Sequence, residues 1–161
     1  LLYASVNVSP KFGIFRPTWG FNYNQQFFDT KKYGASKALS KPLLSCSLNN
    51  NFALSETMNA AIRLNASTTH ADGFLMMKSG YSVNLQFNKS FANRTWIIYL
   101  SANDIFKTAK ERWTMYGLGS DTIKDCYNYT RSISLQVTYN FNAKRSKYKG
   151  TGAGNEEKSR L

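Results

Sequence analysis

Apolar and polar residues alternate strictly along residues 132–142, SISLQVTYNFN, and none of them is charged. The apolar positions are Ile133, Leu135, Val137, Tyr139 and Phe141. A period of two puts these side chains on one face of a β-strand and the polar ones on the other. The alternation runs over about twice the length of a typical strand, roughly 5–6 residues. We therefore expect a long strand with a different environment on each face.

Six further spans show the same alternation, and with 132–142 they predict seven strands. These six are residues 1–9, 17–28, 42–54, 57–67, 79–88 and 95–103. One face is expected to point outward and to carry Leu48, Ile62, Val83, Leu85, Leu135 and Val137. The opposite face is expected to be concave and to carry Asn49, Arg63, Asn84, Gln86 and Gln136. The chain is therefore predicted to be all-β, with a domain over residues 1–142.

Short and long connections alternate between the expected strands. The short ones fall near residues 10, 55 and 92, and the long ones are residues 29–41, 68–78 and 104–131. This pattern predicts an antiparallel up-and-down meander with one short-turn end and one long-loop end. Outer-membrane β-barrels have this asymmetry, and a strand needs roughly 9–11 residues to cross a bilayer at their tilt. We expect a segment of a transmembrane barrel with aromatic residues near both ends of its strands.

The formal net charge of +12 could indicate a nucleic-acid-binding protein. However, the seven spans contain a single charged residue, Arg63, and the other charges lie in connections and in residues 143–161. Nucleic-acid grooves need basic side chains among exposed aromatics on one surface, so we expect no nucleic-acid partner. Residues 143–161 lack periodicity and are rich in Gly and charge, which predicts a disordered basic tail.

No arrangement of residues predicts catalysis, a cofactor or a metal site. His70 is the only histidine, and with Asp72 it lacks further ligands at metal-binding spacing. Cys46 and Cys126 do not form a disulfide framework. Arg63 is the one charged residue expected on the concave face. Two interpretations of its role stay open. It could contact an anionic substrate or a plug carboxylate, or it could be a structural residue bonded to its neighbours.

Four stretches of the sequence resemble one family. They are LSKPLLSCSLNNNFAL, NKSFANRTWIIYLSANDIFKT, RSISLQVTYNFN and GTGAGNEEKSRL, at residues 39–54, 88–108, 131–142 and 150–161. They resemble the C-terminal barrel segment of TonB-dependent receptor-like outer-membrane β-barrel proteins. Complete members have a plug domain and about 22 strands. The resemblance implies a fragment of a bacterial outer-membrane receptor for nutrient uptake, without catalytic activity.

The resemblance also implies a set of partners. These are outer-membrane lipid, a plug domain, further barrel strands, the TonB complex acting through the plug, and the outer-membrane insertion machinery. Tyr139 and Phe141, on the final strand, are the residues that this machinery would read as an assembly signal.

Two alternatives stay open: a complete eight-stranded outer-membrane barrel of adhesin, enzyme or structural type, and a soluble carbohydrate-binding β-sandwich. Small barrels fill their interior with side chains, so a single lumen charge favours a wider barrel. The transported substrate is not predicted.

Overall fold

A computed structural model gives the fold of the chain, and the structure describes residues 1–27, 29–117 and 119–141. The predicted tail, residues 143–161, lies outside the described residues. Within them every regular element is a β-strand. The strands are β1 (Leu2–Val8), β2 (Phe15–Gln25), β3 (Leu43–Ser55), β4 (Met58–Ser67), β5 (His70–Asp72), β6 (Leu75–Met77), β7 (Gly80–Phe91), β8 (Trp96–Asn103), β9 (Lys110–Tyr116), β10 (Asp121–Tyr127) and β11 (Ser132–Tyr139). The described part of the chain contains no helix capable of spanning a bilayer.

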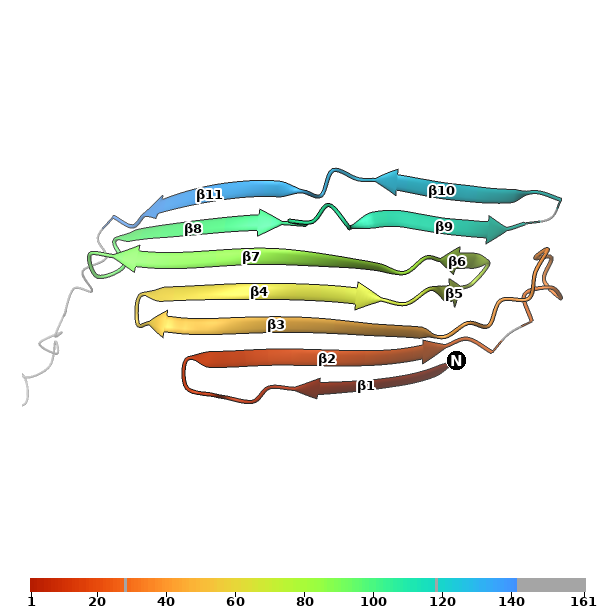
Figure 1. The fold of residues 1–161 in the computed structure, drawn as a ribbon, viewed down its shortest axis with the longest axis horizontal. Coiled ribbons are helices and arrows are strands. Elements are labelled where there is room, and N and C mark those ends of the chain that lie inside the picture. The colour runs from red at the N-terminus through yellow and green to blue at the C-terminus, as the bar shows by residue number, and fades with distance from the viewer. Residues whose placement is uncertain (28, 118, 142–161) are drawn as a thin grey trace, which may run out of the picture.

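Seven of the strands form one long sheet in the order β1-β2-β3-β4-β7-β8-β11 (Figure 1). Each strand pairs antiparallel with the next one in this row. These strands correspond to the seven spans with alternating residues, so the predicted all-β meander is confirmed. Strands β3 and β7 have 13 and 12 residues, compared with about 5–6 in a typical strand.

The other four strands form a second antiparallel sheet in the order β10-β9-β6-β5. They lie within residues 68–78 and 104–131, where the sequence pattern predicts long connections and does not reveal strands. In Figure 1 this sheet lies beyond the ends of β4, β7, β8 and β11 and continues the long sheet lengthwise. The long-loop end of the molecule is therefore largely built from strands.

The register of the long sheet gathers like side chains into rows, as predicted. One row across β3, β4 and β7 is apolar and consists of Leu48, Leu64 and Val83. The next row is polar and consists of Asn49, Arg63 and Asn84. Because neighbouring rows point to opposite sides of a sheet, the long sheet has one apolar face and one polar face.

The apolar face has no protein layer over it in the described structure. Among the described residues, the buried hydrophobic side chains are Ala35, Leu39 and Ala61. On β11, by contrast, Ile133 is 81% exposed and Leu135 is 66% exposed. A soluble sheet buries its apolar face against another layer, so this face requires a non-aqueous environment.

Aromatic side chains border the apolar face at the short-turn end. Trp96 lies opposite both Phe91 and Tyr139 in the register. The ring centroids of Trp96 and Tyr139 are 4.4 Å apart. Tyr139 makes an edge contact with Phe141 at a centroid distance of 4.5 Å. These four rings form an aromatic border of the kind that anchors barrels at the membrane interface.

The apolar band has the height expected for a bilayer. On β7, Tyr81 and Phe91 lie on the apolar face at opposite ends of the strand. The strand between them is roughly 34 Å long at about 3.4 Å per residue. A tilt of about 45° reduces this to a depth of roughly 24 Å, close to the ~25 Å apolar band of outer-membrane barrels.

One charged residue, Lys89, occupies the apolar face. It lies opposite Met58 and Ile98, and its Nζ is 5.0 Å from the ring centroid of Phe91. This places it next to the aromatic border, where a lysine can extend its ammonium group towards water. Val137 also lies opposite Ile98, so Val137 is near the edge of the apolar band.

The turn between β7 and β8 adopts an unusual backbone conformation. Ala92, Asn93 and Arg94 have φ angles of 46°, 54° and 68°, in the left-handed region that side chains other than glycine adopt infrequently. The chain after β11 is attached to this turn. The Asn140 backbone N–H donates to the Thr95 carbonyl oxygen at 2.8 Å. The Asn140 side-chain Nδ2 donates to the Arg94 carbonyl oxygen at 2.9 Å.

Candidate functional site

A polar hollow of about 530 Å³ lies where the long sheet meets the four-stranded sheet. The long sheet contributes small polar side chains to its lining: Asn22, Ser45, Ser47, Asn65, Ser67 and Ser82. These residues belong to the polar face, since Ser45 is opposite Ser67 and Asn65 is opposite both Ser47 and Ser82. The other side of the hollow is lined by His70, Met77, Lys78, Thr108, Lys110, Glu111, Arg112 and Asn128.

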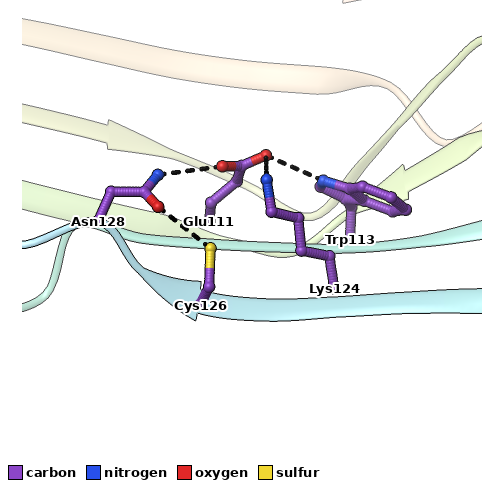
Figure 2. Close-up of polar contacts among 5 residues, drawn as sticks. All are labelled: Glu111, Trp113, Lys124, Cys126 and Asn128. Atoms are coloured by element: carbon purple, nitrogen blue, oxygen red, sulfur yellow. Dashed lines mark hydrogen bonds and ion pairs between the residues drawn. The ribbon is translucent and has the colours of Figure 1, made fainter.

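Glu111 organises a group of polar side chains on β9, on β10 and at the start of the β10–β11 connection, shown in Figure 2. Lys124 Nζ donates to Glu111 Oε1 at 2.7 Å, and Trp113 Nε1 donates to the same oxygen at 3.1 Å. Asn128 Nδ2 donates to Glu111 Oε2 at 3.0 Å. Asn128 Oδ1 in turn accepts a hydrogen bond from Cys126 Sγ at 3.2 Å. The carboxylate thus holds Asn128 in a defined position at the hollow and Lys124 beside Glu111.

These contacts also set the charge state of Glu111. The hydrogen bond from Lys124 is the largest cause, followed by those from Asn128 and Trp113, and together they lower the pKa of Glu111 to about 2. The hydrogen bond with Glu111 raises the pKa of Lys124. Glu111 is therefore ionised at neutral pH and already receives donors on both oxygens. This arrangement suits a positioning role better than proton transfer, which needs a pKa near the working pH.

Asp104 connects the two sheets through a buried carboxylate, and this residue is only 2% exposed. Its Oδ1 accepts hydrogen bonds from the backbone N–H groups of Thr108 at 2.8 Å and Ala109 at 3.1 Å. Its Oδ2 accepts from Thr130 Oγ1 at 2.8 Å. Burial raises the pKa of Asp104, but these hydrogen bonds outweigh burial and the net pKa is lowered. The ionised carboxylate ties the β8–β9 connection to the β10–β11 connection.

The connection between β2 and β3 packs against the four-stranded sheet. Gln26 Oε1 accepts a hydrogen bond from the Gly73 backbone N–H at 2.8 Å. Ser36 Oγ donates to Asp121 Oδ1 at 3.0 Å, and Lys37 Nζ lies 5.5 Å from the ring centroid of Tyr116. The long-loop end is therefore held together across residues that are far apart in the sequence.

The structure places the predicted site residues away from this hollow. Arg63 is exposed on the polar face, where its Nε donates to Asn49 Oδ1 at 3.3 Å, and it is absent from the residues that line the hollow. This bond fits the structural interpretation of Arg63, while substrate contact stays a prediction. Tyr139 and Phe141 lie at the opposite end of the sheet, in the aromatic border, and their role as an assembly signal also stays a prediction.

His70 lines the hollow, but its surroundings give no metal site in the described residues. His70 Nδ1 is 2.8 Å from the Thr68 carbonyl oxygen. No group of three His, Cys, Asp or Glu side chains within residues 1–27, 29–117 and 119–141 could hold a metal ion. Cys46 and Cys126 are free thiols in different sheets. His70 thus contributes a polar ring to the hollow.

Sequence reasoning missed Asp104, Glu111, Arg112 and Lys124 because they lie in a stretch interpreted as a connection. The sequence does contain a hairpin signal in this stretch. Two strand-like runs, KERWTMY and DTIKDCY, flank the glycine-containing loop GLGS at residues 117–120, and two such runs around a short glycine loop indicate a β-hairpin. A search for uncharged spans could not find it, since these strands carry charges on both faces.

The match to known proteins covers both sheets. Residues 2–139 match the model of the outer membrane protein beta-barrel family. This range contains every described strand, from β1 to β11. The chain belongs to the outer membrane protein beta-barrel family. Comparisons with curated proteins and with solved structures gave no match.

Membership of the family accounts for the two-sided long sheet. An outer-membrane barrel exposes an apolar band outward and keeps polar residues inside. In this chain β1 and β11 stand at the two ends of the seven-strand row, so the sheet is open and each of these strands pairs on one side. Most of the long-sheet residues that line the hollow belong to the inner, polar side of this wall, at its long-loop end, and Cys46, Ala66 and Tyr81 of the apolar face also line it.

Proposed function

We propose that this chain is the C-terminal part of a receptor barrel in the bacterial outer membrane that takes up a nutrient with energy supplied through TonB. The observation that carries the proposal is the two-sided long sheet. One face is an exposed apolar band bordered by aromatic rings, and the other is a polar face that leads to a hollow of about 530 Å³. The first face suits membrane lipid and the second suits a hydrated passage with a binding site.

The proposed activity is gated binding, in which no bond is made or broken. The hydroxyl and amide groups of Ser45, Ser47, Asn65, Ser67 and Ser82 can hydrogen-bond a solute such as a glycan fragment, a peptide or a metal chelate. Glu111 keeps Lys124 and Asn128 in fixed positions near the same site. The plug domain and further strands of the receptor would complete the passage, and the TonB complex would act on the plug.

The same outward face supports the proposed assembly route. Tyr139 and Phe141 present aromatic rings at the end of β11, which is also an edge strand with unpaired backbone groups. An edge strand can template pairing with another strand, and aromatic rings anchor at the membrane interface. We propose that the outer-membrane insertion machinery reads these features.

The arrangement of the sheets favours this function over the alternatives. A soluble β-sandwich stacks two sheets face to face around a shared core, whereas these two sheets lie end to end (Figure 1). A complete small barrel would fill its interior with side chains, whereas the polar face here carries mostly Ser and Asn beside a hollow.

Growth on a limiting nutrient tests the proposal. The bacterium that carries the gene is grown on panels of oligosaccharides, peptides and iron chelates, with and without the gene. Loss of growth on one class identifies the substrate, and deletion of TonB should remove the same growth. Growth that survives the loss of TonB would contradict energised uptake.

A matched pair of variants then tests the hollow. Asn65→Trp fills it, whereas Asn59→Trp places the same side chain on β4 outside the lining. We expect Asn65→Trp to lower substrate affinity about tenfold, equivalent to about 1.4 kcal/mol, and Asn59→Trp to have little effect. Equal effects of the two variants would place the binding site elsewhere.

A further inference from the structure

A second, smaller hollow of about 160 Å³ lies on the polar face of the long sheet, towards its short-turn end. We call it the Tyr99 hollow. Six of its eight lining residues belong to the polar face: Asn51, Asn59, Ala61, Gln86, Asn88 and Tyr99. None of the eight also lines the polar hollow at the long-loop end. The two hollows are therefore separate sites on the same wall.

Tyr99 lies in the middle of a row of amide side chains on this face. Asn88 on β7 and Gln136 on β11 lie opposite Tyr99 on its two sides. Asn59 on β4 lies on the far side of Asn88. Neighbouring strands are about 4.8 Å apart, so an amide stands close to each side of the ring. Ala61 follows Asn59 on the same face, and its small side chain leaves the space beside the row open.

The polar groups of this row are available to a ligand. Within the described part of the chain, none of these side chains makes a hydrogen bond: Asn59, Gln86, Asn88, Tyr99 and Gln136. None of their polar atoms is buried. Other amides of the polar face are occupied, since Asn49 accepts a bond from Arg63 and Asn84 accepts one from the Asp104 backbone N–H. Free amides thus gather around Tyr99.

This combination of groups suits a neutral sugar. A sugar ring presents hydroxyl groups that donate and accept hydrogen bonds, as amide side chains also do. It also presents an apolar C–H surface, which a tyrosine ring can cover. The described lining contains no charged residue, and Arg16 lies opposite Asn51 but outside the lining. An ionised ligand would lose hydration here without gaining a charged partner in the lining.

We propose that the Tyr99 hollow binds one ring of a neutral oligosaccharide, as a second site on the path that begins at the polar hollow. Tyr99 would cover the C–H surface, while Asn88 and Gln136 would bind hydroxyl groups. Asn59 and Asn65 are six residues apart on β4, roughly 20 Å at about 3.4 Å per residue, so a short oligosaccharide occupies one site at a time. The proposal rests on the uptake function proposed above and names its substrate class.

Native mass spectrometry of the full-length protein in detergent tests the proposal. The probes are maltotriose, cellotriose and mannotriose, with trigalacturonic acid as the anionic control. We expect the wild type to bind two copies of at least one neutral trisaccharide, one in each hollow. Tyr99→Ala should weaken one copy about tenfold, or about 1.4 kcal/mol, and Tyr99→Phe, which keeps the ring, should retain it.

The two tryptophan variants separate the sites. Asn59→Trp fills the Tyr99 hollow and should bind one copy, with the affinity of the polar hollow unchanged. Asn65→Trp fills the polar hollow and should lose the other copy. Leu100→Ala is the control, because it shortens the next side chain along β8, on the opposite face, and it should bind as the wild type does.

Two bound copies in Tyr99→Ala at wild-type affinity would overturn the proposal. Tighter binding of trigalacturonic acid than of the neutral probes would overturn it in favour of an anionic ligand. A wild type that binds none of the neutral probes, or one copy that only Asn65→Trp removes, would also overturn it. Growth that does not depend on TonB would refute the proposed uptake and leave a Tyr99-dependent copy standing.

Discussion

The long sheet and the four-stranded sheet use the same antiparallel pairing along one chain, but they differ in charge. In the strands of the long sheet the charged residues are Arg16, Arg63 and Lys89. In β9 and β10 alone they are Lys110, Glu111, Arg112, Asp121, Lys124 and Asp125. Because β9 follows β8 directly and β10 leads into β11, this change occurs where the chain passes from one sheet to the other.

The difference reflects the surroundings of each sheet. Backbone groups are satisfied by strand pairing in either environment. A charged side chain on the outward face costs about 2–4 kcal/mol at the bilayer midplane and roughly 0–1 kcal/mol near the interface. In water the same charge can pair with a neighbour, as Glu111 does with Lys124. Charged residues along a strand therefore indicate where the strand leaves the apolar band. Alternation of apolar and polar residues indicates only that the segment is a strand.

The largest expected effect comes from a charge in the middle of the apolar band. Leu85 lies opposite Ile62 and Ala102, close to the middle of the stretch of β7 between Tyr81 and Phe91. Leu85→Arg should lower the free energy of unfolding by about 2–4 kcal/mol, measured by urea unfolding of the full-length protein in lipid vesicles.

The neighbouring residue provides the control. Gln86→Arg adds the same charge to the polar face and should cost well under half as much. Val137→Arg, near the band edge in the same row as Lys89 and Ile98, should cost about 0–1 kcal/mol. Equal costs for Leu85→Arg and Gln86→Arg would contradict the assignment of the faces.

The next largest effect concerns the buried carboxylate that links the two sheets. Asp104→Ala leaves the donors of Thr108, Ala109 and Thr130 without their acceptor. A buried donor left unpaired costs about 1–3 kcal/mol. Thr108 and Ala109 are half-buried, whereas Thr130 is exposed and can donate to water instead, so we expect a loss of about 2 kcal/mol in local stability. Hydrogen exchange should speed up in residues 104–131 and stay unchanged in β3 and β4. Asp104→Asn keeps one acceptor oxygen and should have a smaller effect, whereas faster exchange throughout the long sheet would contradict a local role.

The aromatic border tests whether assembly depends on the long sheet alone. Tyr139→Ala with Phe141→Ala removes two rings from the end of β11 and should lower the amount of full-length protein in the outer membrane several-fold. Met115→Ala with Ile123→Ala removes exposed apolar side chains from the four-stranded sheet and should leave this amount unchanged. Deletion of residues 143–161 should matter less than the double aromatic change. Normal assembly of the aromatic variant, with insertion lost on tail deletion, would place the signal in the tail.

The smallest effect is a pH dependence confined to the four-stranded sheet. The pKa of Glu111 is about 2 in the folded chain, compared with an ordinary value of 4.5. The stability from its hydrogen bonds is therefore fully present above pH 4.5 and is lost as the pH falls towards 2. Hydrogen exchange in β9 and β10 should increase over this range, and Glu111→Gln should flatten the increase. An unchanged acid response in Glu111→Gln would assign the effect to another group, such as Asp104.

Prediction from the sequence was strong for the long sheet and weak for the candidate site. All seven alternating spans became strands in the expected order, because a period of two sustained over so many residues fits a strand and does not fit a helix. The strands β5, β6, β9 and β10 escaped notice since β5 and β6 have only three residues each and β9 and β10 are charged. The hollow was not predicted either, because about half of its lining comes from these strands and their connections.

The sequence by itself determined which residues form the long strands, which face of each strand is apolar, and that the sheet is an antiparallel meander. These properties depend on local periodicity and on the lengths of connections, both of which are written along the chain. Only the tertiary structure decided that Asp104 is buried, that Glu111 meets Lys124 and Asn128, and that Arg112 reaches Ser79. These contacts join residues on different strands and connections, so they depend on register, and register is set by the pairing of whole strands.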